Sequence, residues 1–235
     1  MIRVGINGFG RIGKMVFRLL NQRKDIQVVA VNDPMDLDTL VHLLRHDSVH
    51  GFCDTPAGGD SASGVLLMNG HRIKKYAFYQ PEKIPWSAHR VDLVVESSGK
   101  FISRAQLKGH LQSGVSRVLL SCPGADDLDY TVVRGVNEQG LLPVHRFVSN
   151  ASCTTNCAAP VIKVVDDQWG IDRLMMNTVH PYTNNQQILD GPHRDLRRAR
   201  SAFLNIIPTT TSAIKAVQDV LPHLKGRFDG LATRV

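Results

Sequence analysis

A short segment in the middle of the chain places a cysteine where it could act as a nucleophile. Residues 149–157 read Ser-Asn-Ala-Ser-Cys-Thr-Thr-Asn-Cys, and a largely apolar run follows at 158–165. Ser152 is a favourable N-cap residue, so we predict a helix with Cys153 in its first turn. The dipole and the unpaired N–H groups of a helix N-terminus favour negative charge, and therefore favour the thiolate. A thiolate among hydroxyl groups suits covalent attack on a carbonyl, with an anion bound nearby.

A histidine later in the chain is the candidate base for this cysteine. Among the 10 histidines, His180 alone follows an apolar strand-like run, residues 174–179, and precedes a polar loop. Histidine can take a proton from a thiol because it titrates near neutral pH. The pattern by itself leaves simpler alternatives open. His180 could be an ordinary surface residue, and Cys153 and Cys157 could be two half-buried residues on one helix face.

The N-terminal residues predict a dinucleotide-binding unit. A β-type run at 2–6 is followed by Gly-x-Gly-x-x-Gly at 8–13 and then by apolar residues at helical spacing. A second β-type run, 26–31, is followed by Asp33. The first glycine allows a tight turn, the second lets a pyrophosphate approach the backbone, and the third lets the helix pack closely. Asp33 would accept hydrogen bonds from ribose hydroxyls and repel a 2′-phosphate, which favours NAD over NADP.

Alternating strand-like and helical runs predict the fold class. Strands at 91–95 and 118–120 flank a helix at 102–111, and small polar residues follow the strands. This order is typical of an α/β fold with a parallel sheet whose ligand binds across the strand ends. We therefore predict a doubly wound parallel sheet of the Rossmann type over 1–150, and a catalytic domain over 151–235.

Between these elements, the sequence predicts smaller features. Residues 36–45 have the pattern of a short helix, and 51–75 that of a hairpin region. Glycine-containing stretches predict turns at 57–59 and 69–70 within that region.

Composition limits the class of protein. The 235 residues are 43% hydrophobic and 21% charged, which is typical of a soluble globular protein. No window approaches the roughly 18 apolar residues of a membrane span, and no secretory signal precedes the first strand. The net charge of +7 attracts phosphates, but no aromatic residues interleave with the basic cluster 194–200, so nucleic acid is not an expected partner. We expect a cytoplasmic protein without a metal site, because its cysteines are few and scattered: Cys53, Cys122, Cys153 and Cys157.

Several segments together resemble, in the same order, the phosphorylating glyceraldehyde-3-phosphate dehydrogenase family. The resemblance extends over essentially the whole chain and is most specific around Cys153. It implies a Rossmann-type NAD domain, an α+β catalytic domain and a homotetramer built largely through the sheet of the second domain. The segments that carry it are 7–13, 42–51, 149–157, 180–183, 195–200 and 205–211.

The resemblance also implies a reaction. Cys153 would be the nucleophile and His180 the base, so that the thiolate adds to an aldehyde, hydride passes to NAD, and a thioester remains on the cysteine. Inorganic phosphate would release the acyl group, giving 1,3-bisphosphoglycerate from glyceraldehyde 3-phosphate. NAD would be bound by Gly8, Gly10, Arg11, Ile12, Gly13, Asp33 and Ser121. The substrate phosphate would lie at Thr183, Arg198 and Arg234, and the attacking phosphate at Ser152, Thr154, Thr211 and Ser212. Ser212 stands where the family has a glycine, and its Cβ adds bulk there.

Two alternatives remain on the sequence alone. Residues 121–124, 126–129 and 160–163 look more like the erythrose-4-phosphate dehydrogenase branch. We favour the glyceraldehyde branch because Thr183 and Thr211 belong to its substrate-contacting residues. Family members also continue beyond the motif at the end of this chain. We therefore expect a C-terminally truncated catalytic domain with an incomplete sheet and little or no dehydrogenase activity of this chain alone; the alternative is a non-catalytic NAD-binding remnant.

Overall fold

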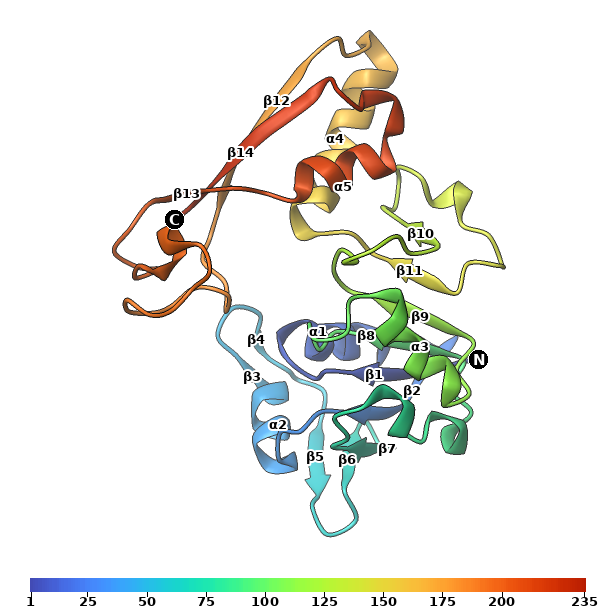
Figure 1. Ribbon diagram of the computed structural model, residues 1–235. Coiled ribbons are helices and arrows are strands. Elements are labelled where there is room, and N and C mark those ends of the chain that lie inside the picture. Colours follow the sequence, from blue (N-terminus) through green and yellow to red (C-terminus); the bar gives the residue numbers. More distant parts are fainter. The chain divides into compact units, whose positions relative to one another are not determined.

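The structure, a computed structural model, describes residues 1–235 and contains two compact units (Figure 1). The first unit comprises 1–131 and 141–150, and the second comprises 132–140 and 151–235. The short segment 132–140 differs from the sequence-based division, which places it in the first domain. It belongs to the second unit because Val133 and Val136 are buried in that unit's core.

A nine-stranded sheet forms the first unit, in the order β10-β11-β9-β8-β1-β2-β7-β6-β5. Strand pairs from β10 to β7 are parallel, and β7-β6-β5 are antiparallel. The chain leaves β1 toward β2 on one side and later returns to β8 on the other. In such sheets the ligand binds beyond the carboxyl ends of the strands at this switch point. The strands are β1 (Ile2–Asn7), β2 (Ile26–Asn32), β5 (Ala57–Asp60), β6 (Val65–Met68), β7 (His71–Tyr76), β8 (Leu93–Glu96), β9 (Arg117–Leu120), β10 (Tyr130–Thr131) and β11 (Phe147–Ser149).

Helices cover this sheet on both faces, as the continuous apolar strands require. Val94 and Val95, neighbours on β8, are buried in different apolar clusters and therefore face opposite sides. One cluster contains residues of α1 (Arg11–Leu20) and α2 (Leu37–Arg45), and α3 (Arg104–Gln112) packs on the strands β9 and β11. Three-residue and four-residue 3₁₀ turns, Pro81–Lys83 and Trp86–His89, complete the layer, and a two-stranded ribbon is formed by β3 (His46–Asp47) and β4 (Gly51–Phe52).

One sequence prediction in this unit is wrong. Residues 57–59 form part of strand β5, and the turn that joins β5 to β6 lies at 61–64. The glycines serve close packing here, because a Cβ on Gly59 would lie 3.0 Å from Cγ of Leu37 on α2. The turn predicted at 69–70 is confirmed: it joins β6 to β7, and Asn69 and Gly70 both have positive φ.

The second unit packs two helices against a three-stranded sheet. Helices α4 (Cys153–Trp169) and α5 (Ala213–Val220) lie together on one side of the pair formed by β12 (Leu174–His180) and β14 (Phe228–Arg234) (Figure 1). Strand β13 (Ile207–Thr209) completes the order β12-β14-β13, with β12 parallel and β13 antiparallel to β14. Single 3₁₀ turns occur at Glu138–Gly140, Leu196–Ala199 and Pro222–Leu224.

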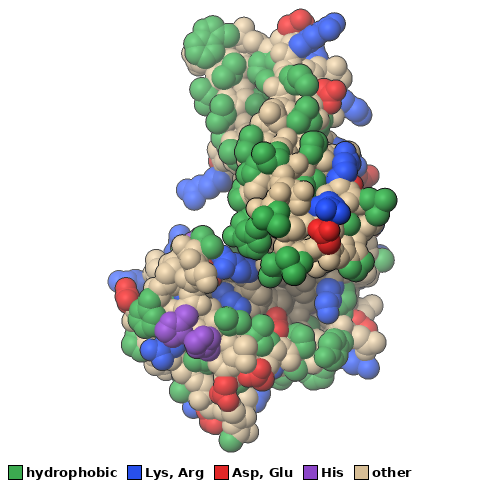
Figure 2. Space-filling model, turned by 90° about the vertical axis from the view of Figure 1, so that its left-hand side faces the viewer, with side chains coloured by type: hydrophobic (Ala, Val, Ile, Leu, Met, Phe, Trp, Pro, Cys, Tyr) green, Lys and Arg blue, Asp and Glu red, His purple; other side chains and the backbone are tan.

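The opposite face of this small sheet is exposed. Burial alternates along β12, so that Met175 and Val179 point to solvent, while Leu174 and Met176 pack against the core. Figure 2 shows many hydrophobic side chains at the surface of the second unit, in the upper part of the view. None of the helices in the structure combines the length and the apolar character that crossing a membrane requires.

Candidate functional site

Cys153 begins helix α4 in the manner that the sequence predicts. The side chain of Ser152 caps the helix, its Oγ accepting a hydrogen bond from the N–H of Thr155 at 3.0 Å. The chain enters this turn through Ala151, which is buried and has φ 57°. Because a left-handed conformation is unfavourable for alanine, the surrounding packing must hold this turn in place. The result is an exposed cysteine at a helix N-terminus.

The end of strand β12 brings His180 to the cysteine. Nε2 of His180 lies 3.4 Å from Sγ of Cys153. On the other side of the ring, Nδ1 lies 2.7 Å from the carbonyl oxygen of Pro181 and 2.9 Å from Nη1 of Arg234. The parallel pairing of β12 with β14 sets His180 opposite Arg234. The imidazole therefore stands between a thiol, with which it can exchange a proton, and a cation.

The guanidinium groups of Arg198 and Arg234 lie beside this pair, and neither forms an ion pair with a carboxylate. Arg198 donates from Nε to Oγ1 of Thr209 at 2.9 Å and from Nη2 to the carbonyl oxygen of Thr210 at 3.3 Å. Burial and the nearby charge of Arg198 lower the pKa of Arg234 from its usual value, and Cys153 acts in the opposite direction. Nε of Arg234 is buried and has no hydrogen-bond partner. Such a pair of partly used guanidinium groups is suited to binding a phosphate.

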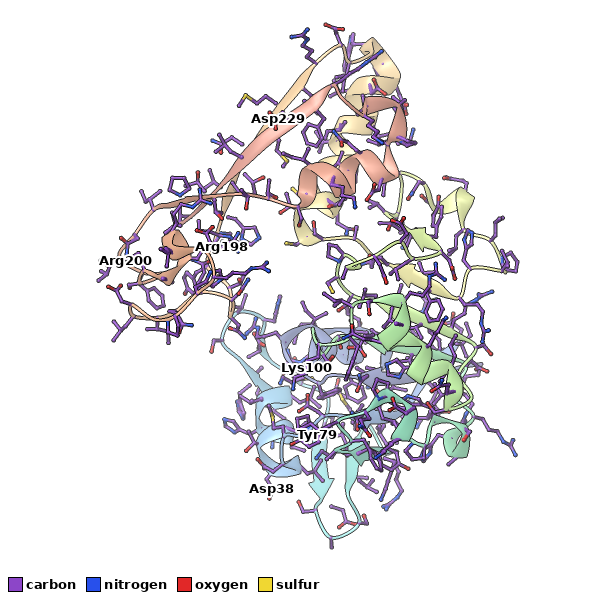
Figure 3. All side chains as sticks on the ribbon, viewed as in Figure 1. Asp38, Tyr79, Lys100, Arg198, Arg200 and Asp229 are labelled. Atoms are coloured by element: carbon purple, nitrogen blue, oxygen red, sulfur yellow. The ribbon has the colours of Figure 1, made fainter.

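Two other arginines of this segment, Arg197 and Arg200, have partners of their own. Arg197 pairs with Asp195, and Arg200 pairs with Asp190 at 3.0 Å; both arginines are exposed. Figure 3 labels Arg198 and Arg200, which lie on different sides of the loop that carries them. Arg198, whose charge acts on Arg234, is thus placed to bind a ligand, whereas Arg197 and Arg200 form surface ion pairs.

Two of the predicted hydroxyl residues, Thr154 and Thr211, have partners that are close to them in sequence. Thr154 Oγ1 lies 4.0 Å from Sγ of Cys153, and Thr211 Oγ1 accepts from the N–H of Ala213 at 3.1 Å. Ser212 is exposed with φ −79°, a conformation open to any residue, so that its replacement of glycine causes no backbone strain. A cavity of about 410 Å³ lies against α4 and β12, and its lining includes Cys153, Thr154 and His180.

Gln186 is a residue of this site that the sequence analysis does not predict. Thr183 is exposed, and its backbone is held by Gln186, whose N–H donates to the Thr183 carbonyl at 2.8 Å and whose Oε1 accepts from the Thr183 N–H at 3.3 Å. The Gln186 side chain is buried, and its Nε2 has no partner. Nothing in the spacing of this polar loop distinguishes Gln186 from its neighbours, so no sequence signal could have identified it.

The glycine loop of the first unit has three different environments. Gly8 has φ 87°, and a Cβ there would lie 2.3 Å from the backbone nitrogen of Ser98. A Cβ on Gly13 would lie 2.1 Å from the Gly8 carbonyl oxygen, whereas a Cβ on Gly10 would meet nothing within 4 Å. The first and third glycines therefore permit close packing of protein on protein. The second leaves open space, as the approach of a pyrophosphate requires.

Asp33 holds this loop as well as facing the cavity. Its Oδ2 accepts from the N–H of Phe9 at 2.7 Å, and its Oδ1 accepts from the N–H of Met35 at 2.9 Å. Each carboxylate oxygen can accept a further hydrogen bond, so ribose hydroxyls remain possible donors. The residues present thus fit a dinucleotide: a backbone loop for phosphates and an acidic side chain for a ribose.

The cavity at this loop has a volume of about 160 Å³ and is formed partly by residues that were not predicted. Of the predicted cofactor residues, Arg11, Ile12, Gly13 and Ser121 are not in its lining. Arg11 instead forms an ion pair with Asp47 at 3.1 Å. Tyr79 and Lys100, labelled in Figure 3, are additional lining residues. The complete lining is Asn7, Gly8, Gly10, Asn32, Asp33, Pro34, Phe78, Tyr79, Ser97, Ser98, Lys100 and Phe101.

Alkylation provides a direct test of the thiol. We expect iodoacetamide to modify Cys153 at pH 7 at least about tenfold faster than Cys122, because the thiolate is the reactive form and burial shields Cys122 from the reagent. Burial and the negative charge of Glu96 raise the pKa of the Cys122 thiol, whereas Cys153 is exposed beside His180. Cys53 is buried and should also react slowly. Peptide mass spectrometry over a time course measures each rate.

The exposed Cys157 serves as the internal control for accessibility. Preference for Cys153 over Cys157 should shrink in the His180→Asn variant. Equal rates at the two exposed cysteines of the unmodified chain would show that His180 does not activate Cys153.

Comparisons with known proteins bear on both units. The family model described as the NAD binding domain of glyceraldehyde 3-phosphate dehydrogenase matches residues 2–104, and that of the C-terminal domain matches 152–235. The chain is 52% identical to the glyceraldehyde-3-phosphate dehydrogenase of Geobacillus stearothermophilus, over 100% of this chain and 69% of the relative. It is 52% identical to glyceraldehyde-3-phosphate dehydrogenase 1 of Bacillus subtilis (strain 168), with the same coverage. It is 48% identical to the Mycobacterium bovis enzyme, over 100% of this chain and 70% of the relative. Because both domain models match and these identities extend along the whole chain, the chain belongs to the glyceraldehyde-3-phosphate dehydrogenase family.

Proposed function

We propose that this protein oxidises glyceraldehyde 3-phosphate with NAD and inorganic phosphate, forming 1,3-bisphosphoglycerate through a thioester on Cys153. This proposal replaces the expectation of little or no activity, because the chain itself brings a nucleophile and a base into contact. The observation that carries the proposal is the distance of 3.4 Å between Sγ of Cys153 and Nε2 of His180, with Arg198 and Arg234 close by. A nucleophile, a base and a pair of phosphate-binding cations are the groups that such a reaction needs.

His180 and Cys153 perform the covalent steps. Nε2 of His180 takes the thiol proton, and the thiolate adds to the aldehyde carbon, forming a C–S bond and an alkoxide. The protonated Nε2 gives its proton to that oxygen and takes it back as the carbonyl forms again. NAD, when bound, accepts the hydride from the same carbon. A phosphate oxygen then attacks the thioester, and the C–S bond breaks to return the Cys153 thiolate.

Two phosphate sites support these steps. Arg198 and Arg234, with Thr183, would bind the phosphate that the substrate carries. Ser152, Thr154, Thr211 and Ser212 would surround the attacking phosphate, where the N-terminus of α4 favours negative charge. Oγ of Ser152 already accepts from the Thr155 N–H and lies 2.7 Å from Oγ1 of Thr155. Its hydroxyl can donate to a phosphate when Thr155 is the donor in that second contact.

The proposed setting is a cytoplasmic homotetramer. All four cysteines are free, as is usual in a reducing compartment. The exposed apolar residues Met175, Val179 and Leu231 lie on strands β12 and β14, and a second copy of the chain would cover such a surface. Sedimentation analysis tests this assembly: a monomeric protein would contradict the proposal.

The substrate test compares two aldose phosphates. NADH formation is followed with the chain, NAD and phosphate, in parallel with glyceraldehyde 3-phosphate and erythrose 4-phosphate. The proposal predicts a higher kcat/KM with the three-carbon substrate. A preference for erythrose 4-phosphate would place the chain in the other branch. NAD binding without NADH formation from either aldose phosphate would favour the non-catalytic remnant.

Arg198→Gln provides a test of the substrate-phosphate site. We expect KM for glyceraldehyde 3-phosphate to rise about 10-fold to 100-fold, because hydrogen bonds to a charged group contribute about 1.5–3 kcal/mol. Activity with unphosphorylated glyceraldehyde should change little. Arg200→Gln is the matched control, since Arg200 is exposed and paired with Asp190. Equal effects of the two variants would place the substrate phosphate elsewhere.

A further inference from the structure

A carboxylate that the proposed reaction does not use is buried at the end of strand β8. Glu96 is fully buried, and so is His110 of helix α3. Asn7 and Asn32, at the ends of β1 and β2, are also buried. A buried carboxylate is unfavourable unless hydrogen bonds satisfy it, so its partners reveal what it holds.

Both oxygens of Glu96 are saturated by donors. Oε1 accepts from the backbone N–H of Ser98 at 2.8 Å and from its hydroxyl at 2.5 Å. Oε2 accepts from Nδ2 of Asn7 at 2.5 Å and from Nε2 of His110 at 3.0 Å. Each of these four groups can donate a hydrogen bond, so both carboxylate oxygens of Glu96 are fully used inside the protein.

The protonation of His110 follows from its other neighbour. Nε1 of Trp86, which can only donate, lies 3.0 Å from Nδ1 of His110. Nδ1 therefore carries no proton, and Nε2–H donates to Glu96 from a neutral imidazole. The contact is accordingly a hydrogen bond in which Nε2 of His110 donates and Oε2 of Glu96 accepts.

The same network continues around the cofactor cavity. Oδ1 of Asn7 accepts from Nδ2 of Asn32 at 2.8 Å. Asn32 in turn binds the backbone of Phe78, accepting from its N–H at 2.8 Å and donating to its carbonyl at 2.9 Å. Asn7, Asn32, Phe78 and Ser98 all line the cavity. One carboxylate is thus connected to the β1 end, to the 97–99 turn and to the 78–79 segment.

The glycine loop and the 97–99 turn are packed too closely for either to shift independently. A Cβ on Gly8 would lie 2.3 Å from the nitrogen of Ser98, so the glycine loop and the 97–99 turn are in direct contact. A shift of Ser98 would therefore move the glycine loop or open a gap beside it. Oγ of Ser97 adds a second tie by donating to the Gly8 carbonyl at 2.7 Å.

We propose that Glu96 is a positioning residue for NAD: by holding Ser98, Asn7 and His110 it keeps the glycine loop, the 97–99 turn and the 78–79 segment in the arrangement that receives the cofactor. The proposal rests on the NAD-dependent function proposed above. Glu96 acts through Ser98 and Asn7, which line the cavity, and takes no part in the covalent steps.

The test measures NAD affinity and backbone protection separately from dehydrogenase activity. Glu96→Gln keeps the size of the side chain but presents an amide donor to neighbours that also donate. We expect its NAD Kd, measured by calorimetric titration of the folded protein, to rise at least about tenfold, and Ser98→Ala to raise Kd by a smaller factor. Ser113→Ala is the matched control. It removes the one hydroxyl donor that lies within 3.2 Å of the carbonyl oxygens of Pro81, Gly109 and His110, just after helix α3 and outside the cavity lining. Kd should stay within about twofold.

Amide hydrogen exchange gives a readout that needs no cofactor. Exchange at the Ser98 amide should accelerate at least about tenfold in Glu96→Gln, because the amide that replaces the carboxylate offers one acceptor oxygen where two are used. Unchanged exchange and unchanged Kd in Glu96→Gln would overturn the proposal and leave Glu96 a purely structural residue. If Glu96→Gln does not fold, Ser98→Ala decides, and an unchanged Kd there overturns it. Failure of the unmodified chain to bind NAD, with the expected change in exchange, would instead contradict the proposed function.

Discussion

The Cys153→Ser variant is expected to form no thioester and to lose at least about 10⁴-fold in kcat, because a serine hydroxyl at neutral pH is a far weaker nucleophile than a thiolate. The variant is nearly isosteric, and Cys153 is exposed, so folding should be preserved. NADH formation under saturating substrate measures the loss. Cys157→Ser, one helical turn away and also exposed, is the control and should retain activity.

The same experiment can show that Cys153 and His180 act as a unit. His180→Asn should lower kcat by about 10²-fold to 10⁴-fold, the usual contribution of a positioned acid–base group. Residues that act in one step have non-additive effects, so the double variant should be no slower than Cys153→Ser alone. Additive losses would indicate that the two residues serve separate steps, contrary to the contact between Sγ and Nε2.

The second large expected effect concerns the glycine loop. One alanine substitution there should weaken NAD binding, and another should lower the unfolding free energy. Gly10→Ala should fold normally, with a change in unfolding free energy within about 1 kcal/mol, because a Cβ there meets no atom within 4 Å. NAD binding should nevertheless weaken about 100-fold, since the methyl group occupies the space that a pyrophosphate needs. Calorimetric titration with NAD and thermal unfolding separate these two quantities.

Gly13→Ala should show the opposite pattern. Its Cβ would lie 2.1 Å from the Gly8 carbonyl oxygen, so helix α1 would have to move away from the loop. We expect a loss of about 3 kcal/mol or more in unfolding free energy, as for severe overpacking. Gly10→Ala with unimpaired NAD affinity would contradict the placement of the pyrophosphate at this loop. A fully stable Gly13→Ala would contradict the packing.

Sequence reasoning succeeded where the chemistry is local. Ser152 and Cys153 are adjacent, so the N-cap and the first turn of α4 could be predicted from neighbouring residues. The glycine loop is likewise a single stretch, whose three glycines have the distinct environments that the motif implies. Turn residues were less reliable, because glycine permits both turns and close packing, and at Gly59 the structure uses the second property.

The parts that could not be predicted depend on contacts between distant residues. Glu96 and Asn7 are separated by 89 residues, and His180 and Arg234 by 54. Each pair meets because two strands are neighbours in a sheet, and strand order is not written in any local pattern. The hydrogen-bond partners within a buried network are even harder to predict from sequence. Glu96 and His110 have the pattern of ordinary polar residues between apolar runs.

Covalent trapping on the cysteine tests the central claim most directly. The chain is mixed with NAD and glyceraldehyde 3-phosphate without inorganic phosphate, quenched in acid and analysed by peptide mass spectrometry, while NADH is recorded. The account predicts a burst of NADH that does not exceed the number of active sites and an equal amount of acyl group on the peptide that contains Cys153. It also predicts that added phosphate removes the acyl group. NADH formation with no acyl group on Cys153, or with the acyl group on another residue, would contradict the account.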